Sequence, residues 1–396
     1  MARFFFISPR KQRGQALFAA LLLLVAGIGA LVFYMADPSR LQRTTDEKTA
    51  AALAHAKEAL IGWKLNDNNR PGVLPCPDIT NTGNAGGFSG NECQSYIGRL
   101  PWKSLGLPDL RDGQGERLWY AVSRNFRNSA SAEPVNTDTK GTITVYTGTT
   151  GTVTTSEAAA VIFAPGSVVG TQNRSSSDTA SCTAPAGTIL RNLCAANYLD
   201  TVSTTNNDSA TGPYIVAQPT TAFNDKLLIV SAADLMIPVE KRAARDMLGL
   251  LQLYKTGSAC NCYPWADVSD GVSNNSLRYG RIPLLGALPT NWSVPFTPAP
   301  WLINNRWWWV FLYTVAGDDT EDHSGGTLRL DGVLGKSVVL ITTGTAGTNR
   351  PIGAPGSWNE SWWDRYVDDP NNFDLGVSFN TPSSTAYDRD RIYTIP

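Results

Sequence analysis

The sequence predicts an α+β fold in which a long N-terminal helix, first apolar and then amphipathic, leads into a head of antiparallel β-sheet units. Three observations predict this fold. A charge-free apolar run covers Ala16–Ala36, apolar residues continue at helical spacing as far as Trp63, and short β-branched runs follow in both halves of the remaining chain. Segments of the two halves recur in one order, which predicts an internal duplication of a helix-plus-sheet unit.

The apolar run is long enough to cross a membrane. Its roughly 20 residues would form a helix that matches a bilayer core about 30 Å thick. The preceding residues include no acidic side chain and four basic ones, Arg3, Arg10, Lys11 and Arg13. We therefore expect a transmembrane helix over 15–36, with a cytoplasmic N-terminus and the head on the outer side of the membrane. The alternative is a secretory leader that is removed, although such leaders usually have a shorter apolar region and a small-residue cleavage site.

The same helix is expected to continue over 37–66 with a different character. Leu53, Ala56, Leu60 and Trp63 recur at the spacing of one helix face, and polar residues occupy most positions between them. The polar run from Asn66 ends the pattern. One face of this second half should therefore pack on the head.

The head is predicted to contain two related α+β units, 67–230 and 231–396. Eight short segments of the first half have counterparts in the second half in the same order; Gly-Arg-Leu-Pro at 98–101, for example, parallels Gly-Arg-Ile-Pro at 280–283. A helix starting near Glu240 corresponds to the amphipathic helix of the first half. Strands are expected where apolar and β-branched residues alternate or run together, at LWYAVS, TITVYT, AAVIFAP and KLLIVS.

The cysteines all lie beyond the apolar run, at Cys76, Cys93, Cys182, Cys194, Cys260 and Cys262. An even number of cysteines in an exported chain favours disulfides. The sequential pairs Cys76–Cys93 and Cys182–Cys194 would close short loops. A bridge between Cys260 and Cys262 would be strained, and a metal site there would need further ligands in a chain with only two histidines.

Two motifs carry a resemblance to a known family. The basic cluster, Gly14 and the uninterrupted apolar run resemble the class III leader of type IV pilins and pseudopilins. Pro-Cys-Pro-Asp at 75–78 and Leu-Pro-Trp at 100–102 are similar to the head of large prepilin-type proteins of Gram-negative bacteria. The resemblance implies that a prepilin peptidase removes the leader 1–14 and that Gln15 becomes the methylated N-terminus. Most family members carry glutamate at the fifth mature position, where this chain has Ala19.

The function that this resemblance implies is structural. The chain would be a minor pilin or pseudopilin, at the tip or in the initiation of a type IV pilus or a type II secretion pseudopilus. It would wait in the inner membrane and then join an extracellular or periplasmic filament, where its N-terminal helix would contact other pilin subunits. Ala19 favours the tip, because the family's glutamate is thought to pair with the N-terminus of a neighbouring subunit.

Two other functions share this topology. A tip adhesin would bind a surface glycan or protein, and the candidate patch is rich in tryptophan. An uncleaved inner-membrane protein with a periplasmic binding domain would never assemble. Packed core residues are the alternative for the tryptophans, and in RWWWVFLY a strand would place Trp307 and Trp309 on one face and Trp308 on the other. The candidate patch comprises Trp301, Trp307, Trp308, Trp309, Trp358, Trp362 and Trp363.

The remaining function classes find little support in the sequence. It has no common hydrolase, metalloprotease or nucleotide-binding motif, so we expect no enzyme and no organic cofactor. The net charge of −1 and the lack of a basic face argue against a nucleic-acid partner. Calcium is the one candidate ion, since its oxygen ligands occur in an acidic loop; solvated turn acids are the alternative. The candidate ligands are Asp318, Asp319, Glu321 and Asp322.

Overall fold

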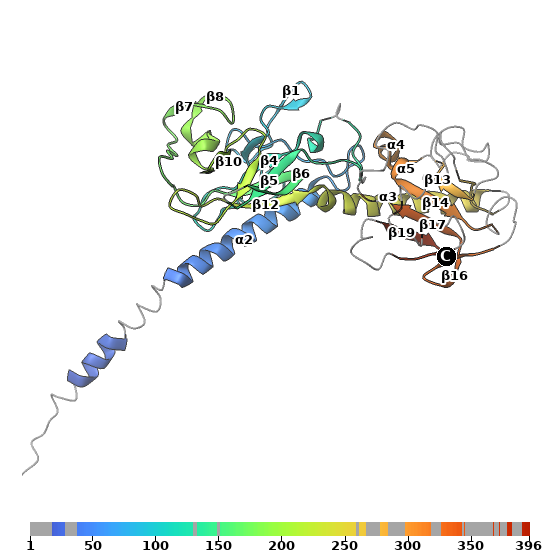
Figure 1. Ribbon diagram of the computed structural model, residues 1–396, viewed down its shortest axis with the longest axis horizontal. Coiled ribbons are helices and arrows are strands. Elements are labelled where there is room, and N and C mark those ends of the chain that lie inside the picture. Colours follow the sequence, from blue (N-terminus) through green and yellow to red (C-terminus); the bar gives the residue numbers. More distant parts are fainter. Residues whose placement is uncertain are drawn as a thin grey trace, which may run out of the picture.

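The protein has a mixed α+β fold that consists mostly of β-sheet, with one helix leaving the head (Figure 1). This architecture is that of a computed structural model. It describes residues 18–27, 38–129, 133–148, 151–258, 261–266, 278–283, 298–317, 326–342, 344, 367, 372, 378–381 and 390–396.

The first sheet has six strands around a long central strand, β6 (Thr152–Ala164). β4 (Trp119–Val122) and β5 (Ile143–Thr147) pair antiparallel with successive parts of β6, and β12 (Lys226–Ser231) pairs with it along the other side. β3 (Ile97–Arg99) extends the sheet beyond β4, and β11 (Tyr214–Val216) pairs parallel with β5. These strands include all four runs predicted from the sequence, which are thereby confirmed.

The apolar run of β6 is buried on both faces of the sheet. Successive side chains of a strand point to opposite faces. Ala160 and Ile162 accordingly belong to the core beneath the helices, while Val161 and Phe163 belong to a second core on the opposite face. A strand covered on both sides needs an uninterrupted apolar sequence, which explains why this segment lacks the polar alternation of a half-exposed strand.

Helix α2 (Pro38–Trp63) packs its second half on β6 and β12. Its buried residues are Thr49, Ala52, Leu53, Ala56 and Leu60, which recur at the spacing of one helix face.

The expected continuous helix from residue 15 to about 66 is wrong, because α2 begins at Pro38. Proline lacks a backbone N–H and disfavours helical backbone in the residue before it, so it suits a first turn and not a helix interior. A shorter helical segment covers residues 18–27.

The predicted transmembrane helix is therefore corrected. Among the described residues, none of the helices is both long and apolar enough to cross a membrane. The single-pass inner-membrane location, which depended on that helix, is corrected with it.

Helix α3 (Ala232–Gly257) connects the two halves of the head. It starts directly after β12, packs on β6 and β12 of the first sheet, and also contacts β19 (Arg391–Ile395) of the second. Figure 1 shows α3 running from one half to the other. The start expected near Glu240 lies about two turns too late, and Pro238 lies inside the helix.

The second sheet has four antiparallel strands in the order β13-β14-β17-β19. They are β13 (Tyr279–Arg281), β14 (Phe311–Val315), β17 (Val338–Thr342) and β19. Two short helices precede β14, α4 (Pro300–Asn304) and α5 (Trp307–Val310).

The two sheets share an order of strands. In the first sheet β3, β4, β6 and β12 follow one another antiparallel, as β13, β14, β17 and β19 do in the second. Gly98 lies opposite Tyr120, and Gly280 opposite Tyr313. The Tyr120 hydroxyl donates to the Pro75 carbonyl at 3.2 Å, and the Tyr313 hydroxyl to the Pro264 carbonyl at 2.8 Å. The domain boundaries 67–230 and 231–396 stay a prediction.

The remaining elements are short and lie around these sheets. Three-residue helical turns occur at Arg124–Phe126, Arg191–Leu193 and Ala195–Asn197. The small strands are β1 (Phe88–Ser89), β2 (Glu92–Cys93), β7 (Thr179–Cys182), β8 (Gly187–Leu190), β9 (Thr201–Val202), β10 (Thr205–Asn206), β15 (Leu328–Leu330), β16 (Val333–Lys336) and β18 (Ser378–Phe379).

Candidate functional site

The helical residues outside the head form an exposed projection. The first turns of α2, from Ser39 to Thr44, are exposed, and Figure 1 shows this end of α2 pointing away from the sheets. Residues 18–27 are helical and exposed throughout. We call residues 18–27 the N-terminal helical segment. Other molecules can therefore contact its side chains directly.

The N-terminal helical segment carries large apolar side chains all around it. An apolar residue buried at an interface contributes about 1.5–3 kcal/mol, and contiguous exposed apolar surface is typical of an interaction site. A helix that is apolar on every side is stable in an assembly only when neighbours surround it. The exposed fractions are 65% for Phe18, 57% for Leu21, 56% for Leu22, 75% for Leu23, 60% for Leu24 and 60% for Val25.

Of the three residues predicted to matter for processing and assembly, one lies within this segment and two precede it. Ala19, the position where the family has glutamate, lies within the segment and is exposed. Gly14 and Gln15 lie outside the described residues, so cleavage between them stays a prediction.

Disulfides close two loops in the first half of the head. Cys76 and Cys93 are joined with their Cα atoms 5.6 Å apart, as are Cys182 and Cys194. Both predicted pairs are thereby confirmed. Cys262 is also disulfide-bonded, and Cys260 lies outside the described residues. Disulfides of this kind are typical of proteins outside the cytoplasm.

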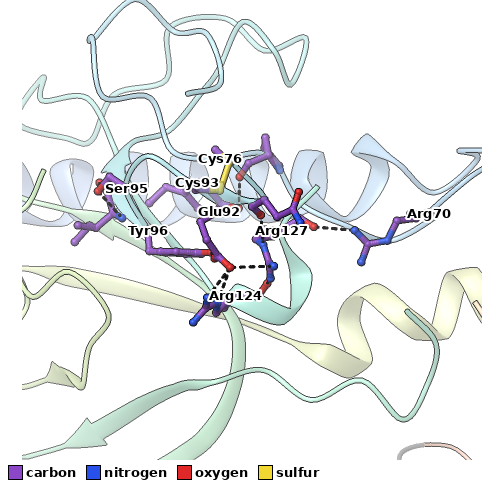
Figure 2. The surroundings of a disulfide bond; sticks show 12 residues. Arg70, Cys76, Glu92, Cys93, Ser95, Tyr96, Arg124 and Arg127 are labelled. Atoms are coloured by element: carbon purple, nitrogen blue, oxygen red, sulfur yellow. Dashed lines mark hydrogen bonds and ion pairs between the residues drawn. A yellow bond between two sulfur atoms is a disulfide. The ribbon is translucent and has the colours of Figure 1, made fainter. Parts of the chain in front are cut away.

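A charged cluster surrounds the Cys76–Cys93 disulfide (Figure 2). Glu92, next to Cys93, accepts hydrogen bonds from Arg124 Nε at 3.0 Å, from Arg127 Nη2 at 3.2 Å and from the Tyr96 hydroxyl. Arg127 in turn offers its backbone carbonyl to Arg70 at 3.2 Å. The cluster therefore fastens the disulfide loop to the chain that leaves α2 and to the turn after β4. The sequence did not lead us to expect this cluster. Its one local indication was Glu92, a charged residue next to Cys93.

The pKa values of Glu92 and Tyr96 fit a structural role for this cluster and not a role in acid–base catalysis. Its hydrogen bonds from Arg124 and Tyr96 lower the pKa of Glu92 below its usual range. Burial, and then the bond to Glu92, raise the pKa of Tyr96 to about 12. At neutral pH Glu92 is thus ionised and Tyr96 neutral, and neither is poised near the pH at which general acid–base catalysis is efficient.

The described tryptophans of the candidate patch are packed in the core. Their exposed fractions are 1% for Trp301, 0% for Trp307, 4% for Trp308 and 6% for Trp309. Trp301 meets Trp307 edge-on with ring centres 6.1 Å apart, and the Arg242 guanidinium lies 4.4 Å from the Trp301 ring. Burial favours the packing alternative for these four. Trp358, Trp362 and Trp363 lie outside the described residues.

The expected alternation of Trp307, Trp308 and Trp309 along a strand is wrong. Residues 307–310 form the helical turn α5, and the strand begins only at Phe311. Arg306, just before the turn, has left-handed backbone with φ 55°. A helical turn rotates successive side chains by about 100°, so all three indoles reach the core around one turn.

The calcium candidates Asp318, Asp319, Glu321 and Asp322 lie outside the described residues. Within the part of the chain that the structure describes, no cluster of three or more acidic, histidine or cysteine side chains could hold a metal ion. Asp112, from another acidic loop, is occupied by protein: it accepts from the backbone N–H groups of Gln114, Glu116 and Gly166 at 2.9 Å. Its carboxylate fixes a turn against the loop after β6.

Comparison with family models, with curated proteins and with solved structures finds no match for this chain. The fold and the exposed residues define a disulfide-bonded α+β protein with an apolar helical projection. The resemblance to pilins therefore stays a prediction that rests on the quoted motifs.

Proposed function

We propose that the protein is a structural subunit of a filament of the type IV pilus or pseudopilus kind, in which its N-terminal helical segment packs against the helices of neighbouring subunits. The single observation that carries this proposal is the exposure of six large apolar side chains on that segment, outside the head. Such a helix needs a surrounding of other helices. The disulfide-bonded head, with α2 packed on the antiparallel pair β6 and β12, supports an exposed position on such a filament.

The test replaces one apolar side chain of the segment with a charged one. Leu23→Asp should abolish the recovery of the protein in filaments sheared from cells, because a carboxylate in an apolar helix bundle has no partner there. The head should fold normally, since Leu23 is 75% exposed. Quantitative immunoblotting of the sheared fraction measures the effect.

A matched substitution controls for the added charge. Val333 in β16 of the head is also exposed, at 62%, so Val333→Asp should leave assembly unchanged. Equal recovery of Leu23→Asp and wild-type protein in filaments would overturn the proposal. Mass spectrometry of the mature chain provides a further check, since processing by a prepilin peptidase predicts an N-terminus at Gln15.

The proposed position is the tip or the point of initiation, and it rests on Ala19. An unpaired carboxylate inside an apolar bundle costs several kcal/mol, and a tip subunit has no subunit above it to supply a partner. Ala19→Glu should therefore reduce the number of filaments per cell without preventing cleavage after Gly14. Electron microscopy with immunogold-labelled heads measures both number and position; even labelling along the shaft in wild-type cells would contradict the tip position.

A further inference from the structure

A small pocket on the first half of the head is lined mainly by cations. It has a volume of about 200 Å³ and lies between the end of β3, the turn that joins Arg111 to Arg117, and the loop that carries Tyr198. Three of its lining side chains are arginines and one is a carboxylate. The lining residues are Asn81, Arg99, Arg111, Glu116, Arg117 and Tyr198.

Arg99 is the buried base of this pocket. Its exposed fraction is 3%, and its guanidinium lies 3.8 Å from the ring of Tyr198 and 4.5 Å from that of Trp119. It donates to two backbone carbonyls, of Arg117 at 2.9 Å and Asn192 at 3.3 Å, while its Nε has no hydrogen-bond partner. Among the described residues, no carboxylate forms an ion pair with Arg99.

A buried cation without a carboxylate in contact is unfavourable for the fold. Neutral carbonyls satisfy some of the guanidinium's donors but do not offset its charge, and buried charges in proteins are normally paired. Burial lowers the pKa of Arg99 to about 10, so the side chain remains a cation at neutral pH. The site therefore keeps a positive charge that an incoming anion would offset.

The surrounding charges leave the pocket with a positive excess. Arg111 and Arg117 share the carboxylate of Asp109, at 2.7 Å and 2.8 Å, and Arg174 pairs with Glu116 at 3.0 Å. Asp78 is the third carboxylate near these arginines, and its negative charge favours the charged form of Arg117. The four guanidinium groups thus meet three carboxylates. Among the described residues Arg99 is the one of the four with no ion pair, and among carboxylates only the more distant charge of Glu116 acts on it.

We propose that this pocket binds an oxyanion, a carboxylate or phosphate group at the end of a larger ligand, between Arg99 and Arg111. The planar guanidinium matches such groups with two parallel hydrogen bonds, and it does so better than a lysine ammonium. A volume near 200 Å³ admits the anionic end of a ligand and leaves the rest outside. This binding site is independent of filament assembly, because no residue of the N-terminal helical segment contributes to it.

The experiment is calorimetric titration of the full-length protein with three probes at constant ionic strength. Sodium glucuronate presents a carboxylate, inorganic phosphate presents a phosphate, and glucose is the neutral counterpart of glucuronate. Saturable binding of glucuronate or phosphate, without binding of glucose, is the expected result, and the tighter probe identifies the source of the oxyanion. Failure of both anions to bind, or equal binding of glucose, would overturn the proposal.

Two variants and one matched control locate the site. Arg111→Gln should weaken anion binding about tenfold, because one charge-assisted pair is lost. Its fold should persist, since Asp109 keeps its pair with Arg117. Glu116→Gln should strengthen anion binding, because it removes the carboxylate that faces the ligand. Arg245→Gln makes the same charge change on an arginine 74% exposed and outside the pocket, and it should leave the affinity unchanged. Equal weakening by Arg111→Gln and Arg245→Gln would reduce the effect to general charge attraction and overturn the site.

Discussion

Asp225 and Asp200 form a pair of buried carboxylates in the first half of the head. Their exposed fractions are 3% and 4%. Asp225 Oδ2 accepts from the Asp200 backbone N–H at 2.7 Å and from Asn207 Nδ2 at 3.0 Å, while Oδ1 has no hydrogen-bond partner. Burial, and then the charge of Asp200, raise the pKa of Asp225 well above its ordinary value. Burial also raises the pKa of Asp200.

A carboxyl group with a raised pKa in the folded state makes stability fall as pH rises. Below the ordinary aspartate pKa of about 3.9 both states are protonated and the contribution is complete; it is lost as pH rises through the folded pKa. Asp225→Asn should therefore increase the free energy of unfolding at pH 8, with the gain vanishing near pH 3.5. The amide oxygen can keep both hydrogen bonds that Oδ2 accepts.

Urea denaturation at several pH values measures this prediction. Asp178 is exposed, so Asp178→Asn is the matched control and should leave the pH profile unchanged. A variant Asp225→Asn that is less stable than wild type at pH 8 as well as at pH 3.5 would contradict the prediction, because it would show that burying the charge of Asp225 does not limit stability.

How far single residues could be predicted depended on how local their contacts are. The pairs Cys76–Cys93 and Cys182–Cys194 close loops with sequence separations of 17 and 12, so neighbouring positions in the chain already indicated them. The arginine pocket instead unites Arg99 with Tyr198, which are far apart in sequence. Only the packing of separate loops brings these residues together, and no local sequence pattern predicts that packing.

At the scale of elements, the start of α3 is fixed by its cap. Ser231 Oγ accepts from the Asp234 backbone N–H at 3.1 Å, and Asp234 Oδ2 accepts from the Ser231 N–H at 2.8 Å. This capping box satisfies two backbone donors that the helix cannot pair internally. Lys57 of α2 also pairs with Asp234 at 2.7 Å, so the cap joins the two helices.

Removing this cap should destabilise the head. Ser231→Ala should lower the free energy of unfolding by about 1 kcal/mol, because the first turn of α3 loses a hydrogen-bond acceptor. Thr44→Ala is the control, since the exposed Thr44 hydroxyl donates only to the Leu41 carbonyl within its own helix. Guanidinium denaturation monitored by circular dichroism compares them. Equal midpoints for Ser231→Ala and wild type would show that the helix start is held by packing alone.

The elements also show which sequence signals were decisive. The continuous apolar run of β6 and the β-branched β12 were predicted, because their side chains satisfy two buried faces whatever lies beyond them. The starts of α2 and α3 were both predicted wrongly, and a proline lies near each of them. Pro38 begins α2 where a longer helix was expected, while Pro238 lies inside α3 where a start beyond it was expected. The Ser231–Asp234 spacing was the available signal for the second start.

At the scale of the whole molecule, one apolar core extends through both sheets. The same cluster of buried side chains contains Ala56 of α2, Tyr120 of the first sheet, Met247 of α3 and Leu340 of the second sheet. A shared core means that unfolding either half exposes apolar surface on the other. The two halves should therefore unfold in a single cooperative transition.

A buried asparagine adds polar contacts across this junction. Asn305, with an exposed fraction of 1%, donates from Nδ2 to the Asn69 carbonyl at 2.7 Å and accepts at Oδ1 from the Val135 N–H at 3.1 Å. Its own carbonyl accepts from Asn136 Nδ2 at 2.9 Å. A residue at the end of α4 thus satisfies backbone groups of two loops in the first half.

Asn305→Ala should weaken the junction without dividing the transition. The variant leaves the Asn69 carbonyl and the Val135 N–H without these partners, which costs about 2–4 kcal/mol in the free energy of unfolding. Asn84→Ala, at an exposed loop position, is the control and should change stability by less than about 0.5 kcal/mol. Urea denaturation followed by far-ultraviolet circular dichroism and by tryptophan fluorescence measures both variants. The two signals should coincide at a lower midpoint in Asn305→Ala, because the apolar core still joins the halves. Separate transitions in the wild-type protein would contradict the shared core, whereas separation only in the variant would assign the coupling to Asn305.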